Sequence, residues 1–376
     1  MAWFKLTLPR SQVDGDKGKK VAEKLRGLEG PWRTQEHREL WLQDRDGSCS
    51  AGEQWDSSLG TIGAGNHFAE IQVVEESANI SHKGLRQGDV VLLVHSGSRG
   101  YGGSVLKKYT AESHTSLEEG SPEAVEYLRE HNKACRWAKA NRDLIALRFL
   151  ACLEPGSEDW QLGVSDAGSL TDVDSMGIER SKSALQARKV VDIWHNNVER
   201  VKWPPSPPPS APGLDEAASS LTLNDDKCVQ KYVYVHRKGA APTYDPESLL
   251  PLTLLPLPGS RATPTLILQP SFSAATSWGL KNALSLAHGA GRSMSRAKAL
   301  SSLSQKYRGQ NILQPRAGET EGTWVICDEK DLVFEEAADA YKNVQAVGQD
   351  LVDVGVAAIV GWCRPRVSYK VRNEAY

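Results

Sequence analysis

A glycine-rich turn is followed directly by an apolar segment in the sequence Leu59-Gly60-Thr61-Ile62-Gly63-Ala64-Gly65-Asn66-His67-Phe68-Ala69-Glu70. Residues 68–74 have the composition of a buried strand. Residues 89–94 form a second such strand, and His95-Ser96-Gly97-Ser98-Arg99-Gly100 follows it. Glycine beside a polar side chain allows the backbone to approach a ligand closely. The two stretches therefore predict strands that lead into a cleft lined by histidine.

The rest of the chain mixes strand and helix patterns. We expect a strand over residues 1–8 and an amphipathic helix over residues 13–28. The longest helix is predicted over residues 121–153, with Ser121 as its cap and Pro122 at its first position. Further expectations are a helix or a helix–strand transition over residues 183–201, a strand over 233–235, a proline-punctuated segment over 251–270 and a mostly helical segment over 337–360. Together these patterns predict a mixed α/β fold in one large domain.

Composition narrows the class of protein. The chain has 376 residues, 40% of them hydrophobic, and its 45 Lys plus Arg against 47 Asp plus Glu give a net charge of −2. These values are typical of a globular protein and exclude whole-chain disorder, collagen and a coiled coil. They also exclude a strongly basic nucleic-acid coat, but a local basic cleft is compatible with them.

The cysteines and the apolar segments predict a reducing compartment, the cytoplasm or the nucleus, and no membrane association. The six cysteines are scattered and show no metal-finger or redox spacing. Residues 262–280 are uncharged, but they contain two prolines and many Ser and Thr residues, which makes insertion into a membrane costly. Residues 1–10 show no signal peptide.

Residues 204–220 include Pro-Pro-Ser-Pro-Pro-Pro-Ser-Ala-Pro-Gly. This composition favours extended polyproline conformations and cannot form a packed core. We therefore expect a disordered, solvent-exposed insertion within the domain.

Three histidines are candidates for metal binding. His67 and His95 each lie at the mouth of a predicted strand, and His195 is a third candidate. Neutral imidazole is a good ligand for divalent manganese, iron and zinc. The alternatives are a loop histidine that bonds to backbone for His67 or His95, and an exposed or capping helical residue for His195.

A fourth histidine is a candidate nucleophile. His288 begins a glycine turn and is followed by Arg292, Arg296 and Lys298. A histidine in this context could attack phosphorus while the cations neutralise the phosphate oxygens. The alternative is a basic surface helix with a capping turn. Further candidates for phosphate contact are Arg237-Lys238-Gly239 and Pro258-Gly259-Ser260-Arg261.

Several of these motifs occur together and in a specific order. They are residues 59–70, residues 95–100, His195-Asn196, Arg237-Lys238-Gly239-Ala240, Pro258-Gly259-Ser260 and His288-Gly289-Ala290-Gly291-Arg292, with Asn141-Arg142, Ala340-Tyr341-Lys342 and Lys370 as further matches. In this order they resemble the RtcB family of RNA ligases, which act in tRNA splicing and RNA repair. The likeness spans about Met1 to Val371, apart from the insertion. Pro31-Trp32 is most similar to the branch that is coupled in bacteria to release factor H, so a release-factor-like partner is a further expectation.

The resemblance implies a single catalytic domain with a deep metal and nucleotide cleft. It implies ligation of an RNA 3′-phosphate or 2′,3′-cyclic phosphate to a 5′-hydroxyl, with GTP and two manganese ions per site. His288 would take GMP from GTP, and His67, His95 and His195 would be metal ligands. The nucleotide would contact Asn66, His67, Phe68, Ala69, Glu70, His195, Asn196, Pro258, Gly259, Ser260, Arg261, His288, Gly289, Ala290, Gly291 and Lys370. RNA or phosphate would contact Arg99, Arg237, Arg292 and Arg296.

Within that likeness, individual roles can be carried over. Asn66 would contact phosphate, Glu70 and Lys370 would read the guanine, and Ser260 with residues 289–291 would line the nucleotide pocket. The substrates would be tRNA halves or other cleaved RNA ends.

One departure from the family pattern lowers the expected activity. The family has an upstream Asp-x-Gly-Cys-Gly-Met motif whose Asp and Cys bind metal, and this sequence lacks it. Asp46-Gly47-Ser48-Cys49 reproduces the Asp-to-Cys spacing by coincidence. We expect a chain truncated at its N-terminus, with Met1 as the last residue of that motif. The alternatives to a ligase are a catalytically impaired nucleotide- or RNA-binding paralogue and a metal-dependent phosphoesterase.

Overall fold

The computed structural model describes residues 1–28, 30–77, 84–110, 116–161, 172–203, 231–245, 250–279, 281–315, 319 and 321–370. The proline-rich insertion predicted at residues 204–220 lies outside these ranges. None of the helices within them combines the length and the apolar composition that a membrane span requires.

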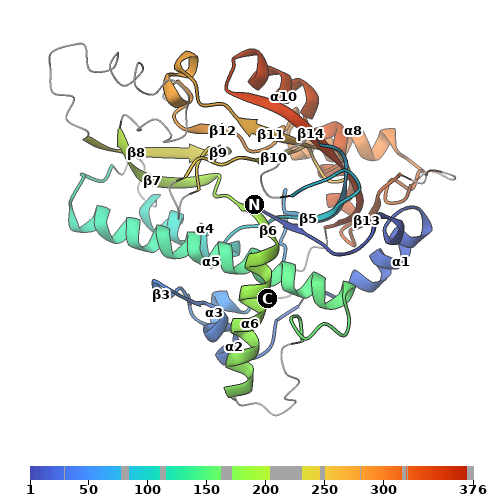
Figure 1. Cartoon of the computed structure of the whole chain (residues 1–376), viewed down its shortest axis with the longest axis horizontal. Coiled ribbons are helices and arrows are strands. Elements are labelled where there is room, and N and C mark those ends of the chain that lie inside the picture. Colours follow the sequence, from blue (N-terminus) through green and yellow to red (C-terminus); the bar gives the residue numbers. More distant parts are fainter. Residues whose placement is uncertain are drawn as a thin grey trace.

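A large sheet forms the centre of the fold (Figure 1). Its strands are β1 (Ala2–Lys5), β4 (Phe68–Ser77), β5 (Val90–His95), β6 (Lys189–Asp192), β10 (Leu255–Pro258), β11 (Thr265–Pro270), β13 (Trp324–Ile326) and β14 (Ala357–Tyr369). The strand order is β10-β11-β14-β4-β5-β1-β6, and every neighbouring pair in it is antiparallel. β13 pairs with β14 in parallel.

Both faces of the central strands are buried. In β1, Phe4 packs into one hydrophobic cluster and Trp3 into another. Leu92 and Leu93 of β5 divide between the same two clusters. Because successive strand residues point to opposite faces, the clusters lie on the two sides of the sheet. This explains why the strands read as continuous apolar runs in the sequence.

Helices cover the sheet. They are α1 (Asp16–Leu25), α2 (Gln35–Trp41), α3 (Glu53–Asp56), α4 (Arg99–Thr110), α5 (Pro122–Leu153), α6 (Asp172–Arg188), α8 (Arg296–Lys306), α9 (Lys330–Glu335) and α10 (Val344–Asp353), with 3₁₀ turns η1 (Arg10–Gln12), η2 (Ala274–Gly279) and η3 (Ala338–Ala340). Figure 1 shows α5 crossing the molecule below the sheet and α10 on the opposite side. The buried Trp137 and Leu144 of α5 belong to the same cluster as Phe4. The Ser121 hydroxyl accepts a hydrogen bond from the Ala124 amide, which confirms the predicted cap.

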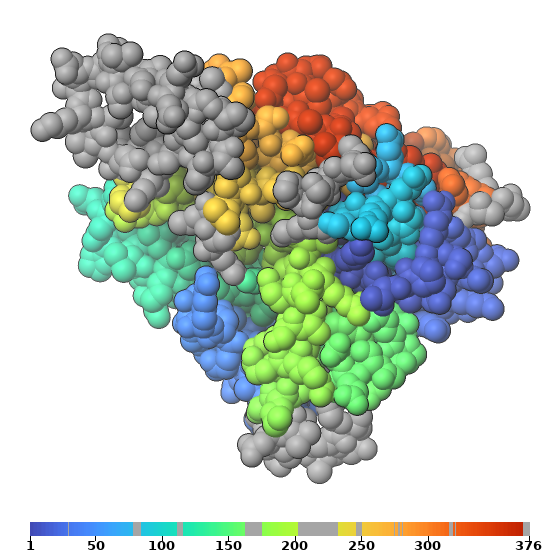
Figure 2. All heavy atoms as spheres, in the orientation of Figure 1, coloured from blue at the N-terminus to red at the C-terminus, as the bar shows by residue number. Residues whose placement is uncertain are grey.

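Within the described residues, three two-stranded ribbons complete the fold. They are β2 (Gln43–Asp44) with β3 (Gly47–Ser48), β7 (Asn196–Trp203) with β8 (Lys231–Lys238), and β9 (Ala240–Pro242) with β12 (Ser285–Ala287). In Figure 2 the yellow-green atoms of β7 and β8 lie next to the teal atoms of α5. The mixed α/β class predicted from the sequence is confirmed.

Two sequence expectations need adjustment. Residues 183–201 form the helix–strand transition rather than one helix, because α6 ends at Arg188 and β6 begins at the next residue. The helix expected over residues 337–360 is wrong at both ends: α10 covers only Val344–Asp353, and residues 357–360 belong to β14. Gly355 has φ of +73°, a conformation that glycine adopts at low cost, and it follows the end of the helix.

Candidate functional site

The sheet brings three histidines to one end. β4 begins immediately after His67, and β5 ends at His95, directly opposite Phe68 in the antiparallel register. β6 ends at Asp192 on the other side of β1, and His195 follows three residues later. The topology thus brings His195 close to His67, although they are 128 positions apart in the sequence.

His288 reaches the same place from the β9–β12 ribbon, since it follows Ala287, the last residue of β12. Its ring stacks on that of His195, with centroids 4.1 Å apart and planes 10° apart. The ring of His95 lies 5.0 Å from His195, 5.7 Å from His288 and 6.1 Å from His67. All four candidate histidines therefore belong to one cluster, which we call the histidine cluster.

Burial keeps these imidazoles neutral. Burial, together with the nearby positive charge of Arg99, lowers the pKa of His67 to about 3. Burial also lowers the pKa of His95 and of His195 well below the usual range, and it lowers that of His288. A neutral imidazole keeps an unprotonated nitrogen, which can bind a metal ion or attack an electrophile.

The cluster fits a divalent metal ion. One nitrogen from each of His95, His195 and His288 lies within 4.8 Å of the other two. Both ring nitrogens of His95 and Nδ1 of His195 are buried without a hydrogen-bond partner. Buried polar atoms normally have partners, so these free nitrogens are well suited to an ion. In the described ranges, no carboxylate or thiolate joins this group.

The set of closest nitrogens differs from the set that the family resemblance implies. The resemblance assigns metal to His67, His95 and His195, whereas the close group contains His288 in place of His67. An ion held by His95 and His195 would therefore lie close to His288.

One backbone contact fixes the orientation of His288. Its Nδ1 lies 2.7 Å from the carbonyl oxygen of Gly239. Because a carbonyl oxygen only accepts, Nδ1 carries the proton and Nε2 keeps its lone pair. Gly239 itself has φ of +70°, and its amide donates to the His195 carbonyl oxygen at 2.8 Å. The glycine turn after β8 thus sets the tautomer of His288.

Asn141 of α5 holds the two glycine-rich loops together. Its side-chain oxygen accepts from the Gly60 amide at 2.7 Å, and its side-chain nitrogen donates to Gly97 O and Ser96 Oγ, each at 3.1 Å. Asn141 is fully buried. It therefore ties the loop before His67 to the loop after His95.

A cavity of about 270 Å³ lies on one side of the histidine cluster. It is lined by Asn66, Phe68, His95, Lys238, Pro258, Gly259, Ser260, Arg261, His288, Gly289, Ala290, Gly291, Arg292, Arg296, Glu336, Tyr341 and Lys370. This set includes most of the residues that the resemblance implies for nucleotide binding. We call this space the nucleotide cavity.

The remaining residues of the implied nucleotide set lie elsewhere. His67, His195 and Asn196 line a neighbouring cavity. Ala69 and Glu70 are completely buried and do not line the nucleotide cavity.

The carboxylate of Glu70 lies behind the wall of the nucleotide cavity. It accepts hydrogen bonds from the Ala262 amide and from the Gln72 side chain, each at 2.8 Å. Burial raises the pKa of Glu70 to about 7. Lys370 does line the cavity, and its Nζ donates to the carbonyl oxygens of His67, at 2.8 Å, and Gly65. Burial lowers the pKa of Lys370 to about 8.

Two arginines of the nucleotide cavity share one buried carboxylate. Glu336, only 1% exposed, lies 3.1 Å from Arg292 and 3.2 Å from Arg296. The Tyr341 hydroxyl donates to the same carboxylate. Glu336 thus holds both guanidinium groups at the cavity wall while cancelling part of their charge. The sequence contained no motif that could have identified Glu336.

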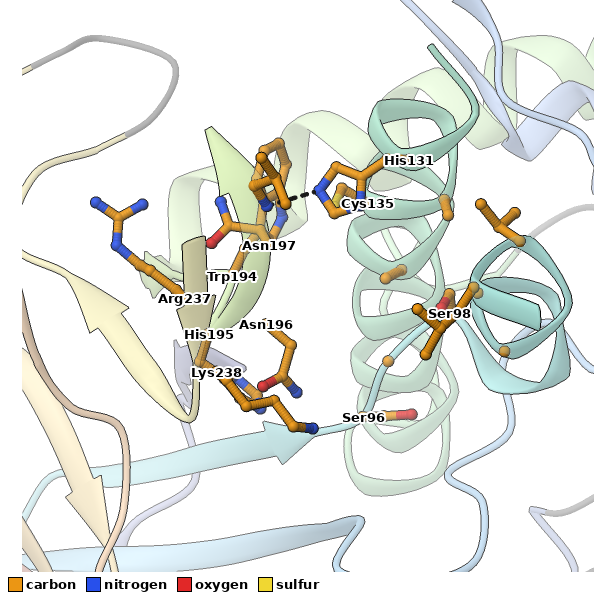
Figure 3. A pocket seen from close by; sticks show the side chains of 18 of the residues that line it. Ser96, Ser98, His131, Cys135, Trp194, His195, Asn196, Asn197, Arg237 and Lys238 are labelled. Atoms are coloured by element: carbon orange, nitrogen blue, oxygen red, sulfur yellow. Dashed lines mark hydrogen bonds between the residues drawn. The ribbon is translucent and has the colours of Figure 1, made fainter. Parts of the chain in front are cut away.

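A second cavity, of about 580 Å³, lies on the other side of the histidine cluster (Figure 3). It extends between the β7–β8 ribbon, α4 and α5, and its lining includes His67, His195 and Arg99. Lys238 lines both this cavity and the nucleotide cavity. The histidines therefore stand between two spaces of different size, and Lys238 stands at their junction.

Arg237 occupies a different environment from the other arginines predicted to contact RNA. Its side chain is 1% exposed and pairs with Glu199 at 2.6 Å, with a further bond to Ser285. Arg237 belongs to the lining of the same cavity as Lys238, but Figure 3 shows the two side chains extending in opposite directions. The charge of Arg237 is thus used inside the fold, and it does not contribute to a positive surface. Successive side chains of a strand point to opposite faces, which accounts for the opposite orientations of Arg237 and Lys238 in β8.

Cys49 is separate from this site. Its thiol donates to the Leu42 carbonyl oxygen at 3.2 Å, next to the β2–β3 ribbon. Burial raises its pKa to about 12. Among the described residues, neither Asp46 nor Cys49 belongs to a group that could hold a metal ion.

Comparison with known proteins identifies one family. The family model of the tRNA-splicing ligase RtcB matches residues 11–165 and 218–371. The unmatched residues between these two segments include most of the proline-rich stretch. The matched segments contain His67, His95 and His288 of the histidine cluster, and His195 lies between the two segments.

Curated relatives agree with that match. An RNA-splicing ligase RtcB2 from Escherichia coli is 32% identical over 336 residues, which cover 88% of this chain and 70% of that protein. A tRNA-splicing ligase RtcB from Methanopyrus kandleri is 29% identical over 358 residues, covering 86% of this chain and 31% of that protein. A tRNA-splicing ligase RtcB from Aeropyrum pernix is 28% identical over 332 residues, covering 82% and 58%. The chain thus spans less than two thirds of the length of the latter two.

Proposed function

This chain belongs to the RtcB family of tRNA-splicing ligases, and we propose that it joins RNA ends with GTP and manganese. The reaction would link an RNA 3′-phosphate, or a 2′,3′-cyclic phosphate after its hydrolysis, to a 5′-hydroxyl. One observation carries the proposal: Nε2 of His288 is left unprotonated by the bond from Nδ1 to Gly239, at the wall of the nucleotide cavity.

The first step is guanylylation of His288. The lone pair on Nε2 attacks the α-phosphorus of GTP, a P–N bond forms, and the bond to the bridging oxygen breaks so that pyrophosphate leaves. The imidazole gains positive charge in this step. The Gly239 carbonyl oxygen accepts from Nδ1–H at 2.7 Å and stabilises that charge.

The next two steps use RNA. An oxygen of the 3′-phosphate attacks the phosphorus of the P–N bond, which restores neutral His288 and leaves GMP on the RNA end. The oxygen of the 5′-hydroxyl then attacks the 3′-phosphorus, its proton is lost, and GMP leaves. Each step transfers a phosphoryl group, so positioned positive charge is the main requirement.

Side chains of the nucleotide cavity supply that charge. Arg292 and Arg296, fixed by Glu336, would contact phosphate oxygens, and Lys370 would contact the nucleotide. His67, His95 and His195 would hold manganese, which when bound supplies further positive charge to the phosphates. His288 would then remain available for covalent chemistry.

A ligation assay tests the proposal. A labelled RNA with a 3′-phosphate is mixed with an RNA that has a 5′-hydroxyl, in manganese, with and without GTP. We expect a joined product only with GTP. Release of free phosphate without GTP would instead identify a phosphoesterase.

A second candidate is a nucleotide- and RNA-binding paralogue without turnover. It is favoured by the composition of the metal-binding group, which among the described residues contains neutral imidazoles only. Three neutral ligands leave the charge of a divalent ion uncompensated, which lowers its affinity. Binding of GTP and RNA without a joined product or a protein–GMP adduct would support this candidate.

A further inference from the structure

We propose that single-stranded RNA reaches the histidine cluster along one face of the β7–β8 ribbon, in contact with Lys238, Arg200 and Tyr234. The inference rests on the proposed function, because it assigns a path for the RNA substrate of the same site. It replaces Arg237, which is paired inside the fold, with its neighbour Lys238 as the cation that faces the RNA.

The register of the ribbon defines this face. Asn196 lies opposite Lys238, Val198 opposite His236, and Arg200 opposite Tyr234. Directly opposed residues in an antiparallel pair share one side of the ribbon, and residues two apart along a strand also share it. From Lys238 to Tyr232 the face extends for about 20 Å. We call it the RNA face of the ribbon.

Two adjoining cavities follow the RNA face. The cavity of about 580 Å³ contacts Asn196, His236 and Lys238 beside the histidine cluster. A cavity of about 670 Å³ contacts Arg200 and Tyr234 farther along the ribbon. Both cavities are lined by His131, Trp194, Asn197 and Val198, and α5 forms the opposite wall of each. The Val198 amide donates to Nε2 of His131 at 3.0 Å in this shared lining. The two cavities follow one another along the ribbon, and we call them together the groove.

Charge along the groove favours a polyanion. Among the described residues that line the inner cavity, none is Asp or Glu. Two of its arginines are already paired, Arg142 with Asp192 and Arg237 with Glu199. Within the described ranges Lys238 forms no ion pair, and Figure 3 shows its side chain extending toward the cavity.

The outer cavity contains both signs of charge. Its Asp44 is bound by Arg136 through two contacts, at 2.5 and 2.8 Å, and Asp46 lies 3.8 Å from Arg45. Lys139 and Arg200 are further cations of the lining. The third carboxylate of the lining, Glu199, pairs with Arg237. Each acidic group is therefore matched by an arginine, and the lining holds four Lys and Arg against three Asp and Glu.

Aromatic groups accompany the cations. The Arg200 guanidinium lies 4.2 Å above the ring of Tyr232, and Tyr234 and Trp194 line the outer cavity. Alternating cations and aromatic rings along a groove are typical of single-stranded nucleic-acid binding, because bases stack on the rings while phosphates pair with the cations. A peptide would not require the stacking surfaces. The combination thus favours a single RNA strand.

Binding of two fluorescent RNA oligonucleotides, one ending in a 3′-phosphate and one beginning with a 5′-hydroxyl, tests the inference. The variants are Arg200→Ala, Tyr234→Ala and Lys238→Ala. Tyr234→Phe keeps the ring, and Lys24→Ala removes an exposed charge from α1, outside the groove. We expect Tyr234→Ala to weaken binding roughly tenfold, and each cation variant to reduce the salt slope by about 0.7. Tyr234→Phe and Lys24→Ala should bind as the wild type does.

The outcomes separate this inference from the proposed function. Arg200 and Tyr234 do not line the nucleotide cavity, so their variants should still form the protein–GMP adduct. Weaker binding of either oligonucleotide supports the inference and identifies the RNA end that uses the groove. Unchanged binding of both oligonucleotides by all three variants, in a protein that ligates RNA, would overturn the inference alone. Equal loss of binding to an acidic peptide would identify the groove as a protein site and also overturn it. A wild-type protein that neither binds RNA nor forms an adduct would refute the proposed function.

Discussion

The carbonyl oxygen of Gly239 accepts a hydrogen bond from Nδ1 of His288 at 2.7 Å, and this contact orients the proposed nucleophile. A Cβ atom added to Gly239 would lie 3.4 Å from Cε1 of His288. Gly239 also requires a positive φ of 70°. Glycine is therefore favoured at this position for two reasons: the turn needs a positive φ, and an added Cβ would contact the His288 ring.

Replacing Gly239 with alanine should slow guanylylation at least tenfold. The new methyl group contacts the His288 ring, and strain in the turn moves the carbonyl oxygen that holds Nδ1. Gly355→Ala is the matched control, because Gly355 has φ of +73° and its added Cβ would have no neighbour within 4 Å. Each substitution should lower stability by about 1–2 kcal/mol. Equal guanylylation rates in the two variants would contradict the positioning role.

Substitution of Glu336 should weaken GTP binding. Glu336→Gln removes the negative charge that holds Arg292 and Arg296, so both guanidinium groups lose their fixed positions. We expect the KM for GTP to rise roughly tenfold, since hydrogen bonds to charged groups contribute about 1.5–3 kcal/mol. Steady-state ligation of RNA at varied GTP concentration measures this KM. Asp339→Asn, which breaks the exposed pair with Lys306, should leave the KM unchanged, and a similar rise in that variant would refute a specific role for Glu336.

Glu70 should make stability depend on pH. Burial raises its pKa in the folded protein from the usual 4.5 to about 7. The folded state therefore holds this proton more tightly than the unfolded state does. The stabilisation is fully present below about pH 4.5 and is lost as the pH rises through about 7.

Glu70→Gln should remove this contribution. Urea unfolding midpoints at several pH values between 5 and 8 should fall with rising pH more steeply in the wild type than in Glu70→Gln. Glu76→Gln alters an exposed carboxylate of the same strand and should retain the wild-type slope. Parallel curves for the wild type and Glu70→Gln would show that Glu70 titrates normally.

Local patterns were enough to predict several elements. The run after His67 and the run before His95 became β4 and β5, because strands buried on both faces are continuously apolar. Ser121 and Pro122 correctly marked the start of α5. The end of α10 was missed because Gly355, which follows the helix, lay inside a segment that otherwise reads as amphipathic helix.

Local sequence patterns predicted less of the candidate site than of the secondary structure. The glycine-rich motifs predicted that His67, His95 and His288 matter, and His195 was a further candidate without such a motif. The topology accounts for their meeting. Glu336 has no neighbouring motif, and its importance arises only from tertiary contacts. Arg237 was chosen as an RNA contact because arginine suits phosphate, but its burial against Glu199 depends on the fold of the whole ribbon.

Labelling with GTP tests the central claim most directly. The protein is incubated with manganese and GTP labelled at the α-phosphate, and the product is examined before and after acid treatment. We predict a protein–GMP adduct that is labile in acid, consistent with a P–N bond, and that is absent from His288→Ala. An adduct that persists in His288→Ala, or no adduct in a wild-type protein that ligates RNA, would contradict the assignment of His288 as the nucleophile.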